Sequence, residues 1–281
     1  MKRKKTGKTG GLHPKKRLGQ HFLVDRGAME KIVQIADVDL HDVILEIGPG
    51  SGEMTALLAK KSRKVIAVEI DQVLADRVRE KTASLGNVDV IHGDALKVDL
   101  EEICRPTGGK LKVVANLPYQ ISTPLLMRFL GVRYLFSSMV LMLQKEVAMR
   151  IVAKPRTKAY GSLSVFLQLH ATPTIEMRLP PECFFPRPRV DSALVRFVVH
   201  DTPRLDVCNE SAFRRVVRAS FGHRRKVLKN ALTSIMAKDS LAGEIGEILE
   251  DLGIDPKRRA ETLTLEEFAR LTEGLIPYLS S

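Results

Sequence analysis

The feature that most constrains the fold of this chain is a short apolar run, Val43–Ile47, that leads directly into a glycine-rich turn. Gly48, Gly50 and Gly52 form the turn, and a helical stretch begins near Met54. Glycines let a ligand approach the backbone where side chains would block it. The glycine spacing differs from the dinucleotide fingerprint, and no Gly-Lys-Ser/Thr of a P-loop follows. This run therefore predicts an α/β sheet with a ligand-binding loop at a strand end.

Further apolar runs alternate with helical stretches as far as residue 200, which predicts an α/β domain with a mostly parallel sheet. The candidate strands are residues 43–47, 64–69, 88–91, 111–115, 139–143 and 193–199. Candidate helices between them include residues 54–60 and 72–83. Ser122-Thr123-Pro124 has the hydroxyl cap and early proline of a helix start.

After Pro203 the strand signals stop and helical patterns take over. These patterns lie around residues 209–220, 223–237, 241–252 and 264–277. The first fifteen residues are rich in Lys, Gly and Thr, as disordered tails are. We therefore expect a disordered basic tail over 1–15, an α/β domain over 16–203 and a small all-α domain over 204–281.

The positive charge of the chain is local. The net charge is +12, and residues 1–17 contain eight Lys or Arg without any Asp or Glu. Residues 204–230 contain eight basic residues against Asp206 and Glu210. Either patch by itself is compatible with a solvated tail or helix face. Two such patches favour a polyanionic partner, and RNA or DNA is favoured over a membrane.

Other features of the sequence disfavour several classes of protein. No apolar run approaches the roughly 20 residues of a membrane span, and the basic N-terminus lacks the apolar region of a secretory signal. Cys104, Cys183 and Cys208 lie far apart in no metal-binding spacing. We therefore expect a cytoplasmic, monomeric protein without a metal site.

Four successive predicted strands have functional residues at their ends, and Glu46 and Gly48 mark the end of the first strand. Glu69 ends the second strand about twenty residues after the glycine turn, where a carboxylate can accept hydrogen bonds from ribose hydroxyls. Asp94 follows the third strand, where it can accept a hydrogen bond from an adenine amine, and Asn116 follows the fourth. Because ligands of open α/β sheets bind at the carboxyl ends of strands, this series predicts a nucleoside-type cofactor.

The tetrapeptide Asn116-Leu117-Pro118-Tyr119, the NLPY turn, indicates what the protein acts on. It places an amide, a backbone restricted by proline and an aromatic ring together at a strand end. Such a set can hold a flat ring that carries an exocyclic amine. The turn therefore lies where a substrate would meet the cofactor.

Several motifs in this order resemble class I S-adenosylmethionine-dependent methyltransferases, and more narrowly the KsgA-type ribosomal RNA adenine dimethyltransferases. The match runs from about Lys16 almost to the C-terminus. It includes residues 17–25, 46–52, 116–119, 184–192, 220–230 and 259–263. The resemblance implies a Rossmann-like domain with a seven-stranded sheet. It also implies N6,N6-dimethylation of adenosines, two adjacent ones, in small-subunit ribosomal RNA during ribosome biogenesis.

The resemblance also implies the roles of individual residues. Cofactor contacts fall on His21, Leu23, Gly48, Gly50, Glu69, Asp94 and Asn116. The position of His21 is often Asn in this family. The NLPY turn holds the target base, with Tyr119 on one face and Phe184 on the other, although the adjacent Phe185 makes core packing an alternative for Phe184.

In-line methyl transfer requires the amine nitrogen at near-attack distance from the methyl group. The lone pair of the adenine amine is delocalised into the ring, so two acceptors that hold its N–H bonds can turn it toward the methyl group. The Asn116 side-chain oxygen is one acceptor, and the Leu117 carbonyl is a candidate for the other. Pro118 biases Leu117 toward an extended conformation, which fixes the direction of that carbonyl. No strong general base is required, because the amine loses its proton after methylation.

The basic residues of the helical region are expected to bind RNA phosphates without reading sequence. They are Arg214, Arg215, Arg218, Arg224, Arg225, Lys226 and Lys229. Three other functions remain open. The first is a resistance-type methyltransferase of large-subunit RNA, and the second is a DNA adenine or protein glutamine methyltransferase, which commonly has Pro where this chain has Leu117. The third is a ribosome-assembly factor in which catalysis is secondary.

Overall fold

The computed structural model describes residues 14–15, 18–223, 225–237 and 239–279. The chain divides into two compact units. The first consists of Met1–Ala148 and Thr174–Val199, and the second of Met149–Pro173 and His200–Ser281. The domain boundary expected at residue 203 stays a prediction. The packing of the chain places Met149–Pro173 in the same unit as the helical C-terminal part. The expected disordered tail over 1–15 lies almost entirely outside the described residues.

The first unit is built on a seven-stranded sheet with the order β4-β3-β2-β5-β6-β9-β7. The strands are β2 (Val43–Ile47), β3 (Lys64–Glu69), β4 (Val88–His92), β5 (Leu111–Asn116), β6 (Phe136–Gln144), β7 (Ala171–Leu179) and β9 (Ser192–Val199). The β4-β3-β2-β5-β6 part is parallel, and β9 pairs antiparallel with β6. The expected mostly parallel, seven-stranded Rossmann-like sheet is therefore confirmed.

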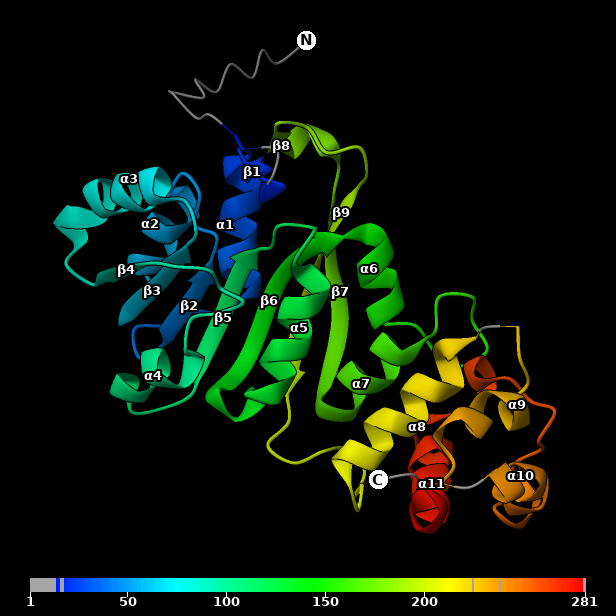
Figure 1. The fold of residues 1–281 in the computed structure, drawn as a ribbon. Coiled ribbons are helices and arrows are strands. Elements are labelled where there is room, and N and C mark those ends of the chain that lie inside the picture. Colours follow the sequence, from blue (N-terminus) through cyan, green and yellow to red (C-terminus); the bar gives the residue numbers. More distant parts are fainter. Residues whose placement is uncertain (1–13, 16–17, 224, 238, 280–281) are drawn as a thin grey trace. The chain divides into compact units, whose positions relative to one another are not determined.

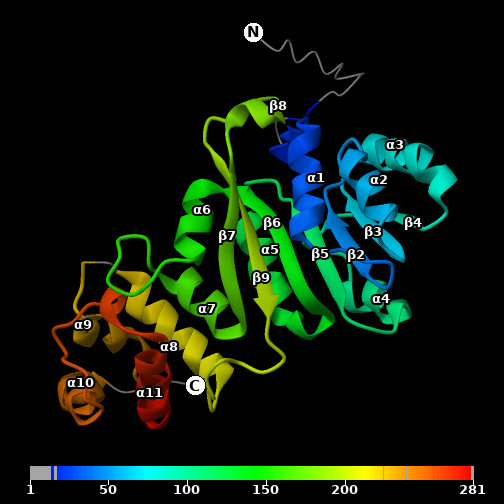
Figure 2. The same ribbon diagram turned by 180° about the vertical axis from the view of Figure 1, so that it is seen from behind.

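The central strands form because their residues are almost all apolar. Every residue of β2 is buried, and β3 is buried except for its first residue. Continuous apolar runs are characteristic of parallel strands that are covered on both faces. In Figure 1, α5 (Ser122–Gly131) lies in front of the sheet, and in the reversed view of Figure 2, α1 (Arg26–Ile35) lies in front of it.

Further helices connect the strands of the first unit. They are α2 (Glu53–Ala59), α3 (Gln72–Thr82) and α4 (Leu100–Cys104), and α6 (Lys145–Ile151) follows β6. The helix expected at residues 122–124 does begin there, but its N-cap is Ile121 without a side-chain hydrogen bond. The Ser122 hydroxyl instead donates to the Tyr119 carbonyl, so the expected hydroxyl cap is wrong.

Three strands were absent from the expected set. β7 alternates exposed residues with half-buried ones between its two buried ends and contains Pro173, so it lacks the continuous apolar run that marked the other strands. A separate two-stranded sheet pairs β1 (Phe22–Leu23) antiparallel with β8 (Phe184–Phe185). These strands are far apart in sequence and only two residues long. No local pattern reveals such a pair.

The second unit is helical in its C-terminal part. It contains α7 (Ser162–His170), α8 (Glu210–Gly222), α9 (Leu228–Leu232), α10 (Asp239–Asp251) and α11 (Leu265–Leu275) (Figure 1). The helix expected over 223–237 is much shorter, because Val227 is extended with ψ 160°. The amide of Leu228 donates a hydrogen bond to the Arg258 carbonyl, and the amide of Lys229 donates one to the Pro256 carbonyl. This tertiary pairing overrides the local helical pattern.

Aromatic rings form the centre of the second unit. Tyr160 packs edge-on against Phe221, with ring centroids 5.9 Å apart. Phe221 lies 5.6 Å from Phe268, which is fully buried. These contacts join the segment before α7 to α8 and α11. Within the described residues, no helix is both long and apolar enough to cross a membrane.

Candidate active site

A pocket of the first unit lies where β2, β3, β4 and β5 end. It is lined by residues 18–22 and by residues of these four strand ends, including Gly48, Gly50, Glu69, Asp94 and the whole NLPY turn. The carboxyl ends of parallel strands meet at one edge of a sheet, which is where ligands of such folds bind. The structure therefore brings together the cofactor residues expected from the sequence, except Leu23.

The glycine-rich turn follows β2 in a conformation that favours glycine. Gly48, Gly50 and Gly52 have φ values of 69°, 56° and 73°, in the left-handed region that other residues rarely adopt. A Cβ atom at Gly50 would lie 2.8 Å from Cδ1 of Phe22. The turn therefore brings bare backbone to the pocket wall, as a cofactor that approaches the main chain requires.

Glu69 lies at the end of β3 and is only 3% exposed. Its Oε2 accepts a hydrogen bond from the Gly50 amide at 3.2 Å, and its Oε1 accepts one from the Asp71 amide at 3.0 Å. Burial raises the pKa of Glu69, and the two backbone hydrogen bonds partly oppose that rise. The carboxyl group is thus held in place, and each oxygen keeps a lone pair for a ligand hydroxyl.

Asp94 lies after β4 and lines the same pocket. Its Oδ1 accepts a hydrogen bond from the amide of Leu96 at 2.9 Å, which begins a turn after the strand. Its second oxygen receives no hydrogen bond from the described residues. Asp94 can therefore both shape the turn and accept a hydrogen bond from a bound base.

The NLPY turn presents two hydrogen-bond acceptors to the pocket. Asn116 Nδ2 donates to the main-chain carbonyl of His21 at 2.8 Å, which directs the amide oxygen away from that carbonyl. Neither this Oδ1 atom nor the Leu117 carbonyl accepts a hydrogen bond from any described residue. Leu117 lines the pocket but is only 1% exposed as a whole residue, backbone included.

Tyr119 is held at both its ring and its hydroxyl group. The ring stacks on His21 with centroids 5.4 Å apart and planes at 28°. The hydroxyl group lies 2.6 Å from Oγ of Ser192. Burial raises the pKa of Tyr119, so the phenol is uncharged at neutral pH. An uncharged aromatic ring at this position suits base stacking.

Leu23 and Phe184 do not line this pocket. They are paired across β1 and β8, are 7% and 2% exposed, and pack in the hydrophobic core with Met29 and Met54. Leu23 borders a smaller adjoining hollow with Gly48 and Gly50. The arrangement corresponds to core packing for Phe184, whereas Phe185 is 38% exposed. The expected stacking role of Phe184 stays a prediction that requires the side chain to move.

Glu46 belongs to the series of strand-end residues in the sequence, but no contact with the cofactor or the base was expected of it. Its carboxyl is completely buried in β2, and neither oxygen has a hydrogen-bond partner among the described residues. Burial raises the pKa of Glu46 to about 8, and the neighbouring Thr55 hydroxyl has a smaller opposite effect. That hydroxyl does not reach hydrogen-bonding geometry either. The signal in the sequence is a lone glutamate inside an apolar strand.

The basic residues expected to bind RNA belong to the second unit and differ in exposure. Arg218, Arg225 and Lys226 are exposed, whereas Arg214 lies 3.9 Å from Glu210 in an ion pair. Arg215 and Lys229 are half-buried. Arg224 lies outside the described residues. Arg218, Arg225 and Lys226 are therefore the most accessible described members of the expected RNA-binding set, whose role stays a prediction.

A further basic segment of the second unit is absent from the expected set. Residues 150–158 contain Arg150, Lys154, Arg156 and Lys158 without an acidic residue. Lys154 and Arg156 are exposed, and the Arg156 amide donates to the Glu261 carbonyl at 2.7 Å. The signal in the sequence is four basic residues within nine positions.

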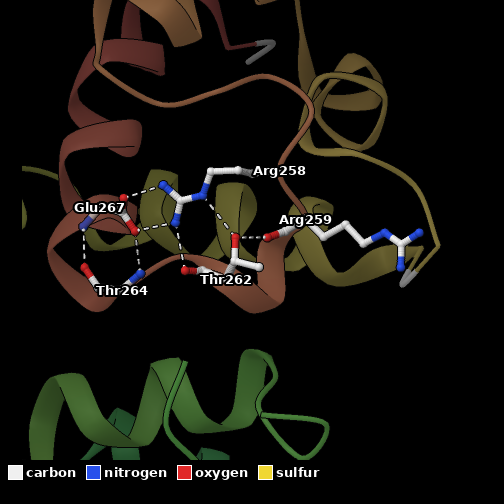
Figure 3. A network of polar contacts seen from close by, with 5 residues as sticks. All are labelled: Arg258, Arg259, Thr262, Thr264 and Glu267. Carbon is white, nitrogen blue, oxygen red and sulfur yellow. Dashed lines mark hydrogen bonds and ion pairs between the residues drawn. The ribbon is translucent and has the colours of Figure 1, made fainter. Parts of the chain in front are cut away.

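A polar network fixes the turn before α11 (Figure 3). Arg258 donates to both carboxylate oxygens of Glu267, at 2.6 and 2.9 Å. Its Nε donates to the Thr262 hydroxyl at 3.1 Å, and its Nη2, which also binds Glu267, donates to the Thr262 carbonyl at 2.8 Å. Glu267 also completes a capping box with Thr264 at the start of α11. The hydrogen bond from Arg258 lowers the pKa of Glu267, so the pair is charged at neutral pH.

The donor set of the pocket fits a nucleoside-type cofactor better than a metal ion. Within the described part of the chain, no group of three His, Cys, Asp or Glu side chains could hold a metal. The pocket instead combines a bare glycine backbone at Gly50 with carboxyl groups at Glu69 and Asp94. These groups match the ribose and base of a nucleoside.

Known proteins resemble the chain along most of its length. Residues 11–273 match the family described as "Ribosomal RNA adenine dimethylase". The "Ribosomal RNA small subunit methyltransferase A" of Geobacter metallireducens is 47% identical over 268 residues, which cover 95% of this chain and 97% of that protein. The likeness therefore extends over both compact units.

Two solved structures also resemble the chain over most of its length. A dimethyladenosine transferase from Plasmodium falciparum has a TM-score of 0.78 and 27% identity, and the match covers 90% of this chain and 97% of that chain. The 23S rRNA methyltransferase ErmE has a TM-score of 0.68 and 25% identity, with 90% of this chain and 99% of that chain covered. Both also match the chain beyond its α/β sheet.

Proposed function

This chain belongs to the ribosomal RNA adenine dimethylase family, and we propose that its pocket holds the cofactor beside an adenine gripped by the NLPY turn. As a member of this family, the protein is an S-adenosylmethionine-dependent enzyme that dimethylates adenine in ribosomal RNA. The cofactor supplies an electrophilic methyl group on a sulfonium. Which residues bind the cofactor and the base is our proposal.

We assign the cofactor to the glycine-rich turn and the acidic strand ends. The backbone of Gly48 and Gly50 lets the cofactor approach, Glu69 accepts hydrogen bonds from ribose hydroxyls and Asp94 accepts one from the adenine amine. The fixed Glu69 carboxyl and the left-handed glycines support this assignment. His21 and Asn116 close the side of the pocket next to the substrate.

The observation that carries the catalytic proposal is the pair of available acceptors at the NLPY turn. Asn116 Oδ1 and the Leu117 carbonyl receive no hydrogen bond from described residues, and Asn116 is held through its nitrogen. Two acceptors can bind both N–H bonds of an amine and turn its lone pair toward the methyl group. Holding reacting atoms in a near-attack geometry is a large source of rate enhancement.

The second methylation places a different demand on the same acceptors. After the first transfer the amine has a single N–H bond, so one acceptor hydrogen bond is lost. The remaining acceptor must then orient a bulkier amine. We propose that Asn116 Oδ1 keeps this hydrogen bond, because the amide group is anchored through its nitrogen on the His21 carbonyl.

We further propose that the protein acts as a monomer on two adjacent adenosines of the immature small subunit, in the cytoplasm. The 47% identical relative is named for the small subunit, whereas the neighbour named for 23S rRNA is 25% identical. Small-subunit RNA is therefore favoured over the resistance-type alternative.

Asn116→Ala is the test of the catalytic proposal. The variant should bind S-adenosylmethionine within about threefold of the wild type, whereas methyl transfer should fall by at least about 100-fold, as expected when the reacting amine is misplaced. Calorimetry measures the first quantity and transfer of a labelled methyl group to immature small subunits measures the second. Asn230→Ala, an exposed asparagine of the second unit, is the control. Near-normal transfer by Asn116→Ala would falsify the proposed mechanism.

The RNA-binding role of the basic residues predicts a particular salt dependence. Arg225→Ala removes one phosphate contact and should therefore make the negative slope of log affinity against log salt concentration shallower by about 1. Arg156→Ala tests the further basic segment in the same way. Lys61→Ala, an exposed lysine of the first unit, should leave the slope unchanged. An unchanged slope for Arg225→Ala would remove that residue from the RNA contact.

A further inference from the structure

We propose that the His21 side chain is a positioning group that fixes the Tyr119 ring for stacking on the target base, rather than a contact for the cofactor. This inference rests on the proposed function of the NLPY turn.

The imidazole of His21 is held between two segments that are distant in sequence. Its ring stacks on Tyr119 with centroids 5.4 Å apart and planes at 28°. Its Nδ1 lies 2.7 Å from the Pro186 carbonyl. A carbonyl can only accept, so Nδ1 is the protonated nitrogen and donates this hydrogen bond. The ring therefore has a defined tautomer and a defined plane.

The plane of the imidazole determines the plane of the tyrosine ring. Stacking fixes Tyr119 on one face, and its hydroxyl group is held by Ser192 at 2.6 Å. A ring held at its face and at its edge is already ordered before the base arrives. The base then stacks without ordering the side chain, which is how pre-organisation improves binding. Because His21 covers one face of Tyr119, the base must use the opposite face.

The main chain of His21 has a separate task. Its carbonyl accepts the hydrogen bond from Asn116 Nδ2, and a side-chain substitution leaves this carbonyl in place. Substitutions at His21 therefore loosen Tyr119 while the acceptor for the amine stays oriented. A loss of stacking weakens the ground state and the transition state alike, which raises KM and leaves kcat unchanged.

Three variants separate the ring contact from the hydrogen bond. His21→Phe keeps a stacking ring without the donor, His21→Asn keeps a donor without the ring, and His21→Ala keeps neither. We expect KM for RNA to rise about tenfold, equivalent to about 1.4 kcal/mol, in His21→Ala and His21→Asn. In His21→Phe it should stay within about threefold of the wild type. The affinity for S-adenosylmethionine and kcat should change less than about threefold in all three variants.

Each alternative has its own signature. A weakened cofactor affinity with an unchanged KM for RNA would make His21 a cofactor contact and overturn the proposal. Equal losses in His21→Phe and His21→Ala would show that stacking contributes nothing. If His21→Ala does not fold, the comparison of His21→Phe with His21→Asn still decides. Failure of the proposed function itself is recognised separately, by normal transfer in Asn116→Ala.

Discussion

The first unit around the pocket and the Arg258 network of the second unit treat carboxyl groups in opposite ways. Burial raises the pKa values of Glu69, which lines the pocket, and of Glu46 in the strand beneath it, and no described cation pairs with either carboxyl group. In the network, Glu267 is paired with a guanidinium, and its pKa is lowered. The Glu69 carboxyl group can therefore still accept hydrogen bonds from a ligand, whereas Glu267 uses its hydrogen-bonding capacity within the protein.

This difference separates polar groups that serve function from those that serve stability. A carboxyl without a charged partner is costly to bury, and sites with such groups are common where ligands bind. A bidentate pair that also caps a helix has little capacity left for a ligand. The contrast can be tested through the pH dependence of folding and through the tolerance of each region to substitution.

The largest expected effect concerns Glu46. Its pKa is raised from 4.5 to about 8, so the folded state binds its proton more tightly than the unfolded state does. Its contribution to stability is complete below pH 4.5 and is lost as the pH rises toward 8. Glu46→Gln should remove several kcal/mol of this pH dependence, measured by urea unfolding across that range. An unchanged slope would mean that Glu46 does not carry the buried proton.

A smaller and opposite effect is expected at Glu267. Because its pKa is lowered, the contribution of Glu267 to stability is present above pH 4.5 and is lost as the pH falls below that value. Glu267→Gln should cost about 1–3 kcal/mol at neutral pH, as for hydrogen bonds to charged groups. The exposed neighbour Glu266 provides the control Glu266→Gln. Equal stabilities of the two variants would contradict a structural role for the network.

The smallest effect compares two left-handed glycines, one from each unit. Gly50→Ala should lower cofactor affinity about tenfold, because the new Cβ atom meets Phe22 and φ is 56°. Gly253 has φ 69° and open space around its Cα, so Gly253→Ala should cost about 1 kcal/mol of stability with unchanged cofactor affinity. Equal cofactor affinities would show that the close approach at Gly50 has no role in binding.

The parts of the fold and site that follow from the sequence are those determined by local pattern. The central strands are continuous apolar runs, and parallel pairing then brings Glu69, Asp94 and Asn116 to one pocket. The approximate positions of these three residues follow from the order of the strands alone. The family motifs added the expected roles, which sequence periodicity by itself does not contain.

The parts that do not follow depend on distant pairing. Which of Phe184 and Phe185 faces the core is decided by β1, since Leu23 pairs with Phe184 and Phe22 with Phe185. The expected helix from 223 is interrupted because its backbone binds the segment near Pro256. Single-residue patterns carry no information about such partners.

The contact between His21 and Pro186 also has a consequence for folding during synthesis of the protein. The two residues are separated by 165 positions. β1 cannot form its antiparallel pair until β8 has been synthesised. Chains are synthesised from the N-terminus, and domains fold as units once their parts are present. A nascent chain therefore cannot hold the His21 ring against the Pro186 carbonyl until the segment around Pro186 has been made. The ordering of Tyr119 by His21 is thus a late event in the synthesis of the chain.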